Sequence, residues 1–191
     1  MQKAAFIKLA ALVAAGVLSQ GAFAADGTIN FTGDIVDAPC SISPNSQNMT
    51  VPLGKVSRNV FGTLSTATPP VFSGGTVGKK STPAKFSIDL LGCGATAKGA
   101  TVTFSGTADL DDATVLRVAN AGQVGAGAAS GVGIEIGDSA GAKIPLGSES
   151  GQYVLGVGDN SLKFQAVYVS TKTTVTTGPA NGTAQFTVAY K

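Results

Sequence analysis

Short segments in which apolar and polar residues alternate recur along the chain, and glycine-rich clusters separate them. Phe86, Ile88 and Leu90, for example, are each preceded by a polar residue. A repeat of two places every second side chain on the same face of a β-strand, so that one face is buried and the other is solvated. Beyond the N-terminal region, no segment keeps the repeat of 3.6 residues that marks an amphipathic helix. The chain is therefore predicted to be all-β.

The expected strands are short and closely spaced, which is typical of an antiparallel β-sandwich. No change of composition marks a second domain, and there is no internal repeat. Residues 56–82 are rich in Gly, Ser, Thr and Pro, and are predicted to form a long surface loop with room for a short turn of helix. The strands are expected at residues 29–35, 84–93, 100–106, 114–119, 131–137, 142–146, 161–171 and 183–190, with a short edge strand at 49–53.

Side chains suited to catalysis are scarce. Histidine and tryptophan are absent, and there are two cysteines. This composition excludes His-based acid–base catalysis, His-containing nucleophile arrangements and zinc sites that need three or four His or Cys ligands. Asp109, Asp111 and Asp112 form a small acidic cluster, but their spacing lacks the glycine and the distal glutamate of a calcium loop. We expect no enzymatic activity, no metal site and no cofactor.

The first 24 residues have the pattern of a cleaved export signal. Two lysines precede an uncharged apolar run at residues 9–18, and small residues follow, which places the cleavage between Ala24 and Ala25. Ten apolar residues are too few to cross a hydrocarbon core about 30 Å thick, so a membrane anchor is not expected. Without the two lysines of the signal, the 13 basic residues fall to 11 and equal the 11 acidic ones. A mature chain without net charge offers no basic patch for nucleic acid or anionic lipid.

Export also determines how the two cysteines are interpreted. Cys40 and Cys93 enter an oxidising compartment as one even pair, so a disulfide between them is expected. Residues 90–93 could alternatively be a lipoprotein acylation box, but such a box lies at the end of a signal, and this one lies deep in the mature chain.

Three stretches of the chain carry a recognisable pattern. The first runs from Gly27 to Ile42 and reads GTINFTGDIVDAPCSI; the others are VGIEIGD at 132–138 and FQAVY at 164–168. These stretches resemble the subunits of chaperone–usher fimbriae, in particular the major pilins of type 1 and P pili. The ending is similar too, with Gly178 fourteenth from the C-terminus and a penultimate Tyr190. The segment between the cysteines is longer than is typical of the family, so the resemblance leaves residues 56–82 unassigned.

The resemblance implies an incomplete immunoglobulin-like antiparallel β-sandwich that lacks its last strand, with an N-terminal donor-strand extension. Residues 1–24 would be the signal, 25–37 the extension and 38–191 the pilin domain. A periplasmic chaperone would lend a strand to the open groove, and at the outer-membrane usher the extension of the next subunit would replace it. The assembled subunits would form a fimbrium on the cell surface, used in adhesion.

The resemblance also assigns roles to particular residues. In the extension, the groove-facing positions would be Ile29, Phe31, Gly33 and Ile35, which lie on one face of a strand. The groove strand, which is the expected docking surface for the chaperone, would present Gly178, Phe186, Val188 and Tyr190.

Parts of the sequence are also compatible with other functions and with another role for the first strand. A minor adaptor subunit of the same fimbrium remains open, whereas a two-domain tip adhesin would need a further domain ahead of Cys40. A secreted β-sandwich enzyme or carbohydrate-binding module is disfavoured, because such modules stack sugars on aromatic rings and this chain has no tryptophan and three tyrosines. By periodicity alone, residues 27–36 could equally be the first strand of a self-contained sandwich.

Overall fold

The computed structural model describes residues 27–32, 39–123, 125 and 127–191. The chain separates into two compact units, residues 1–36 and 37–191, and each is treated by itself. In the first unit, residues 27–32 lie in no helix or strand, and the side chains of Ile29 and Phe31 are 77% and 90% exposed. The predicted signal, its cleavage site at Ala24 and Ala25, and the extension residues Gly33 and Ile35 lie outside the described residues.

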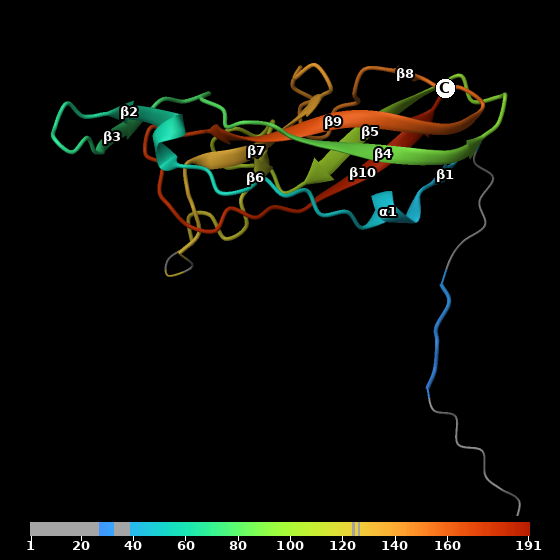
Figure 1. Ribbon diagram of the computed structural model, residues 1–191, viewed down its shortest axis with the longest axis horizontal. Helices are drawn as coiled ribbons and strands as arrows, with labels where there is room; N and C mark the ends of the chain where they lie inside the picture. The colour runs from blue at the N-terminus through green and yellow to red at the C-terminus, as the bar shows by residue number, and fades with distance from the viewer. Residues whose placement is uncertain (1–26, 33–38, 124, 126) are drawn as a thin grey trace, which may run out of the picture. The chain divides into compact units, whose positions relative to one another are not determined.

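The second unit is an antiparallel β-sandwich, as the alternating sequence predicted (Figure 1). One sheet has five strands in the order β1-β4-β9-β7-β6, and the other has three in the order β10-β5-β8. The strands of the first sheet are β1 (Ser41–Ile42), β4 (Ala84–Cys93), β6 (Leu116–Arg117), β7 (Val132–Asp138) and β9 (Gly158–Ser170). Those of the second are β5 (Gly99–Gly106), β8 (Tyr153–Val154) and β10 (Ala184–Tyr190).

The core between the two sheets is built on three phenylalanine rings. Phe164 of β9 lies 5.1 Å from Phe104 of β5 and 5.6 Å from Phe86 of β4, measured between ring centroids. Ile88 and Leu90, the next inward residues of β4, are fully buried. Because Phe86, Ile88 and Leu90 recur at every second position, all three point into this core, as the sequence predicted.

A disulfide joins Cys40 to Cys93, as expected from the sequence. It lies where β1 pairs with the end of β4, through Ser41 opposite Leu91. The amide of Gly94 donates a hydrogen bond of 2.9 Å to the carbonyl of Pro39, so the pairing continues beyond the disulfide. The covalent bond therefore fixes the start of the second unit against one of its central strands.

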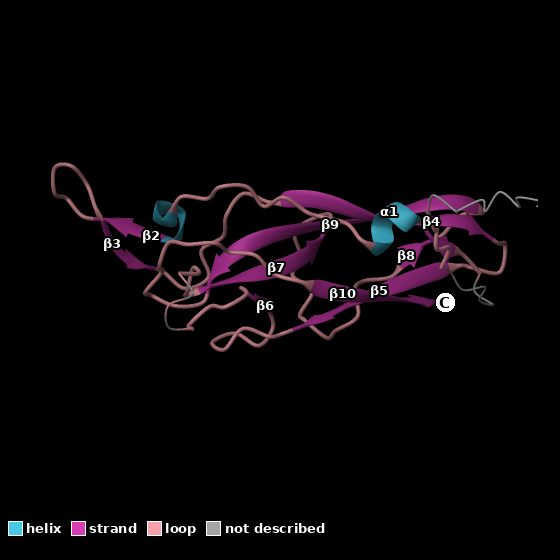
Figure 2. Ribbon diagram, turned by 90° about the horizontal axis from the view of Figure 1, so that it is seen from below, coloured by secondary structure: helices cyan, strands magenta, loops and turns pink. Residues whose placement is uncertain are grey.

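Residues 56–82 are more ordered than a surface loop. They include the 3₁₀ helix η1 (Arg58–Phe61), which is the predicted turn of helix, and a hairpin of β2 (Gly62–Leu64) and β3 (Phe72–Gly75) that the sequence analysis missed. The hairpin projects from one end of the sandwich, opposite the C-terminus (Figure 2). Its position depends on distant residues, since the amide of Gly75 donates to the carbonyl of Thr173 at 2.6 Å and Phe61 is buried.

Three of the expected strands are wrong or shorter than predicted. Residues 142–146 form a single bridge, between Lys143 and Gly137, and 114–119 reduce to β6. Residues 49–53 form no strand, while the short helix α1 (Pro44–Gln47) precedes them. The first two segments lie beside β7 but pair with it over only a few residues: β6 spans two residues, and the amide of Ile144 donates a hydrogen bond of 2.9 Å to the carbonyl of Ile136. Residues 49–53 alternate as well, but among the described residues no strand lies alongside them.

Replacing both Cys40 and Cys93 by serine is expected to lower the free energy of unfolding by about 4 kcal/mol, because the closed loop no longer restricts the unfolded chain. Urea unfolding of the refolded mature chain measures the change. A reducing agent should destabilise the wild-type chain by a similar amount and leave the double variant unaffected. Equal stability of the oxidised and reduced wild-type chain would contradict the expectation.

Candidate functional site

The last strand, β10, is paired on one side only. It runs antiparallel to β5 from Ala184, opposite Gly106, to Tyr190, opposite Ala100. Among the described residues, no strand pairs with its other edge. Peptide groups along such an edge have no partner in the sheet, so this side of the sandwich is open to another strand.

A groove runs along this free edge. It consists of three adjoining hollows, with cavity volumes of about 730, 440 and 370 Å³, and neighbouring hollows share lining residues. Its floor is made of inward side chains of the first sheet: Phe86 of β4, Ile134 and Ile136 of β7, and Ala166 of β9. The groove therefore opens onto the interior of the sandwich, where a missing strand would place its side chains.

The opposite wall of the groove is the extended segment 49–56. Met49, Val51 and Leu53 are half-buried and line the groove, and the residues between them are exposed. Within the part of the chain that the structure describes, residues 49–56 make no backbone hydrogen bond to another segment. Both walls thus present unpaired peptide groups beside an apolar floor.

The C-terminal end of β10 is tied to the disulfide region. The hydroxyl of Tyr190 donates a hydrogen bond of 3.3 Å to the carbonyl of Cys40, and the Lys191 amide donates to the Gly99 carbonyl at 2.8 Å. Burial raises the pKa of the Tyr190 hydroxyl, which keeps it protonated as a donor. The Lys191 contact continues the pairing with β5, and the Tyr190 contact ties the end of the strand to the disulfide region.

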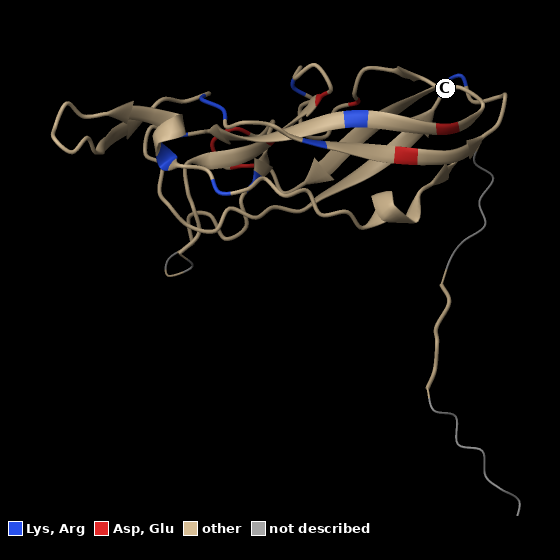
Figure 3. Cartoon of the chain, in the orientation of Figure 1, with Lys and Arg blue, Asp and Glu red and all other residues tan. Residues whose placement is uncertain are grey.

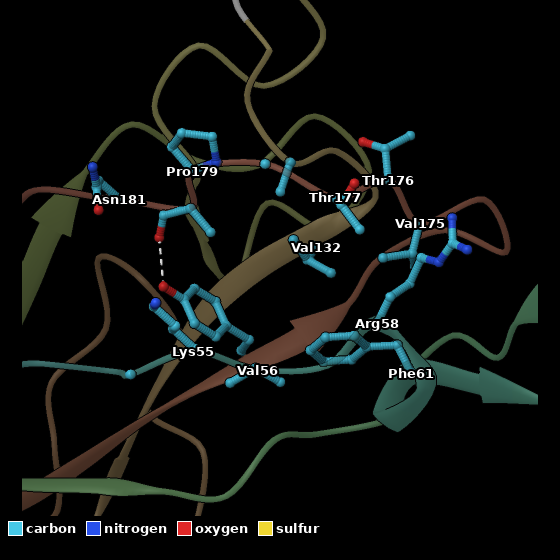
Figure 4. Close-up of a pocket in the computed structure, with 15 residues that line it drawn as sticks. Lys55, Val56, Arg58, Phe61, Val132, Val175, Thr176, Thr177, Pro179 and Asn181 are labelled. Carbon is cyan, nitrogen blue, oxygen red and sulfur yellow. Dashed lines mark hydrogen bonds between the residues drawn. The ribbon is translucent and has the colours of Figure 1, made fainter. Parts of the chain in front are cut away.

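The other end of the groove lies near the 3₁₀ helix. In Figure 4, Lys55, Val56 and Arg58 lie along one side of the hollow, and Thr176 to Asn181 lie along the other. Tyr168 of β9 crosses beneath and donates a hydrogen bond of 2.6 Å to the carbonyl of Ala180. Burial raises the pKa of the Tyr168 hydroxyl, so the hydroxyl keeps the proton that it donates to a higher pH than a solvated tyrosine would.

Gly178 lies in the loop before β10, outside the groove strand, and helps to form this end of the groove. Its φ of +155° is a conformation that residues with a side chain rarely adopt. A Cβ atom at this position would also collide with the carbonyl oxygen of Gly127 and the backbone of Ala128. Glycine is required here because two loops meet backbone to backbone.

The structure places the predicted site residues as follows. Phe186 lines the groove, and Val188 and Tyr190 are partly buried and pack against the core from the same strand. Ile29 and Phe31 are exposed in the first unit. Residues 49–53 were expected as an edge strand from the alternation of Met49, Val51 and Leu53, but neither their role as a groove wall nor that of Tyr168 was predicted from the sequence.

Other kinds of site are not found in the described part of the chain. There, no group of three or more His, Cys, Asp or Glu residues could hold a metal ion. No helix in the described residues has the length and hydrophobicity to span a bilayer.

Comparisons with known proteins agree with this architecture. Residues 29–191 match the family described as Fimbrial protein. The chain is 41% identical over 185 residues to "Long polar fimbria protein A" of Salmonella typhimurium, which covers 95% of this chain and 94% of the relative. It is 40% identical, with the same coverage, to "Probable major fimbrial subunit LpfA" of Escherichia coli O157:H7. The P pilus rod subunit PapA has a similar fold, with a TM-score of 0.60 and 23% identity over 81% of this chain and all of that one.

Substituting Gly178→Ala should destabilise the sandwich by about 1–3 kcal/mol, because the loop must adopt a strained conformation and move away from Gly127. Gly151→Ala is the matched control, since a Cβ there meets no atom within 4 Å and the change should stay within about 0.5 kcal/mol. Thermal unfolding of the refolded mature chain compares the two. Equal effects of the two substitutions would show that the close approach at Gly178 is unimportant.

Proposed function

The chain belongs to the fimbrial protein family and is a structural subunit of a fimbrium, and on that premise we propose that residues 25–37 of one subunit fill the groove beside β10 of its neighbour. These residues are called the donor segment below. Each junction of the fibre would then be a sandwich completed by a strand from another subunit, which is a form of β-strand addition.

The open groove is the observation that carries this proposal. It combines two features that a single inserted strand would satisfy together, namely the unpaired edge of β10 and the apolar floor formed by Phe86, Ile134 and Ile136. A flat apolar ligand would leave the peptide groups without partners. A strand with apolar residues on one face supplies both hydrogen bonds and side chains.

The donor segment has the complementary properties. Ile29 and Phe31 are on one face by the repeat of two, and both are largely exposed. Burial of each would contribute about 1.5–3 kcal/mol, and each new backbone hydrogen bond about 1 kcal/mol. A strand of this length therefore supplies enough free energy to make a fibre junction effectively permanent.

Assembly by this route needs a partner that covers the groove before the donor segment arrives. We propose a periplasmic chaperone that lends a strand along β10, with Phe186, Val188 and Tyr190 as its docking face, and an outer-membrane usher where the exchange takes place. Transit through the periplasm follows from the export signal and suits the disulfide, which needs an oxidising compartment.

A role as the major shaft subunit is preferred to that of a minor adaptor. The relative that is 40% identical over nearly the full length is named as a probable major fimbrial subunit.

Gly33 provides the sharpest test of the donor segment. It lies on the same face as Ile29, Phe31 and Ile35. A large side chain there should therefore overpack the completed sandwich and destabilise it, typically by about 1–3 kcal/mol or more. Gly33→Leu should leave the subunit folded and able to bind its chaperone, but should block its insertion into a neighbour, and Gly33→Ala should have a milder effect. Surface fibres and SDS-resistant oligomers are measured after co-expression with chaperone and usher.

The matched control is Thr32→Leu, which places the same leucine side chain on the opposite face of the segment. It should assemble at close to the wild-type level. Wild-type polymer from Gly33→Leu would rule out residues 25–37 as the donor segment.

A further inference from the structure

The groove beside β10 is almost free of charge. The hollow beside α1 and the central hollow are lined by uncharged residues, and the sequence is uncharged from Ser41 to Gly54 and throughout β10 (Figure 3). The described charged residues that line the groove are Lys55 and Arg58, here called the basic pair. Both are in the hollow near the 3₁₀ helix, so all the charge lining the groove is positive and lies at one end.

The basic pair is available to a ligand. None of the five ion pairs formed among the described residues involves Lys55 or Arg58. Lys55 is exposed, and the guanidinium of Arg58 stacks over the ring of Phe72 at 4.6 Å from its centroid. Stacking uses the face of a guanidinium and leaves its N–H groups free to bind a carboxylate.

The donor segment carries the opposite arrangement of charge. Residues 27–33 are uncharged, and Asp34 and Asp37, here called the acidic pair, follow at its C-terminal end. The remaining carboxylate, Asp26, would adjoin the new α-amino group of Ala25 after cleavage, so that end has no net charge. Segment and groove thus each have one charged end, and the two signs are complementary.

The direction of insertion determines whether these charges meet. β10 begins near the basic pair, because Thr177 to Asn181 line the same hollow, and it ends beside Cys40. A donor segment that runs antiparallel to β10 brings its C-terminal end to the basic pair. The parallel direction would place both carboxylates beside α1, where the lining residues are uncharged and the carboxylates would lose hydration without a partner.

We propose that Lys55 and Arg58 bind Asp34 and Asp37 of the incoming subunit, and that this contact sets the direction of the inserted strand and speeds its capture. The inference rests on the proposed donor-strand function. Asp37 shares the groove-facing side with Ile35, and Asp34 lies on the outer side, so the two carboxylates would flank the rim where the basic pair lies. Complementary charge of this kind acts mainly on association rate and specificity.

The test uses two complementary variants of the full mature chain. The first reverses the basic pair, Lys55→Glu with Arg58→Glu, and the second reverses the acidic pair, Asp34→Lys with Asp37→Lys. Self-assembly of each refolded variant at low salt should be slower than wild type by about tenfold or more, as followed by light scattering and SDS-resistant oligomers. An equimolar mixture should recover, because each donor segment then meets a groove of opposite charge.

Recovery in the mixture separates the proposed contact from damage to folding, since misfolded subunits would not rescue one another. The control variant, Lys85→Glu with Lys163→Glu, makes the same change of net charge on exposed strand positions away from the groove and should assemble like wild type. At about 1 M salt, where the Debye length is roughly 3 Å, the differences in rate should shrink. Wild-type rates for both charge-reversed variants, or a mixture no faster than its components, would overturn the proposal.

Direction is tested by cysteine pairs in the full chain. Val36→Cys with Thr177→Cys should form a disulfide between subunits in the fibre, and Thr28→Cys with Thr177→Cys should not. The reverse result would overturn the assigned direction. A different result would show that the donor-strand function itself is wrong. In that case Gly33→Leu would form fibres, whatever the charge-reversed variants do.

Discussion

The structure depends on one unmet requirement, which is that the peptide groups along β10 need a second strand. Backbone donors and acceptors that face an apolar interior must be paired, and here neither β10 nor the extended wall at 49–56 supplies a partner to the other. An inserted strand can pair with these edges and cover Phe86, Ile134 and Ile136 at the same time. On the proposed donor-strand function, a strand from another subunit would complete the sandwich, and fibre formation would follow from the open groove.

An edge strand of this kind must be held firmly if it is to receive a partner. Three features hold β10: its full pairing with β5, the hydrogen bond from Tyr190 to Cys40, and the pairing of Lys191 with Gly99. The disulfide fixes Cys40 in turn, so the covalent bond acts on the groove through the end of the strand. Preorganisation of this kind reduces the entropy that insertion would otherwise cost.

The two ends of the groove differ in charge. This difference would favour one direction of the inserted strand over the other. The end near the disulfide is uncharged, whereas the end near the 3₁₀ helix carries Lys55 and Arg58 and is shaped by the close approach at Gly178. Apolar burial would provide the strength of the junction, and the charges its orientation.

The amino-acid sequence by itself determined the long strands and the pairing of the cysteines. β4, β9 and β10 could be predicted because alternation is a local property: neighbouring residues alone indicate which side chains share a face of the strand. The resemblance carried by residues 27–42 and the C-terminal ending also pointed to the family. Tertiary structure alone decided the rest: residues 142–146 and 49–53 alternate but form no strand, and the β2–β3 hairpin forms without clear alternation. The groove and the position of Gly178 likewise depend on segments far apart in sequence, because a hydrogen-bond ladder or a close backbone contact exists only when a distant partner is brought alongside.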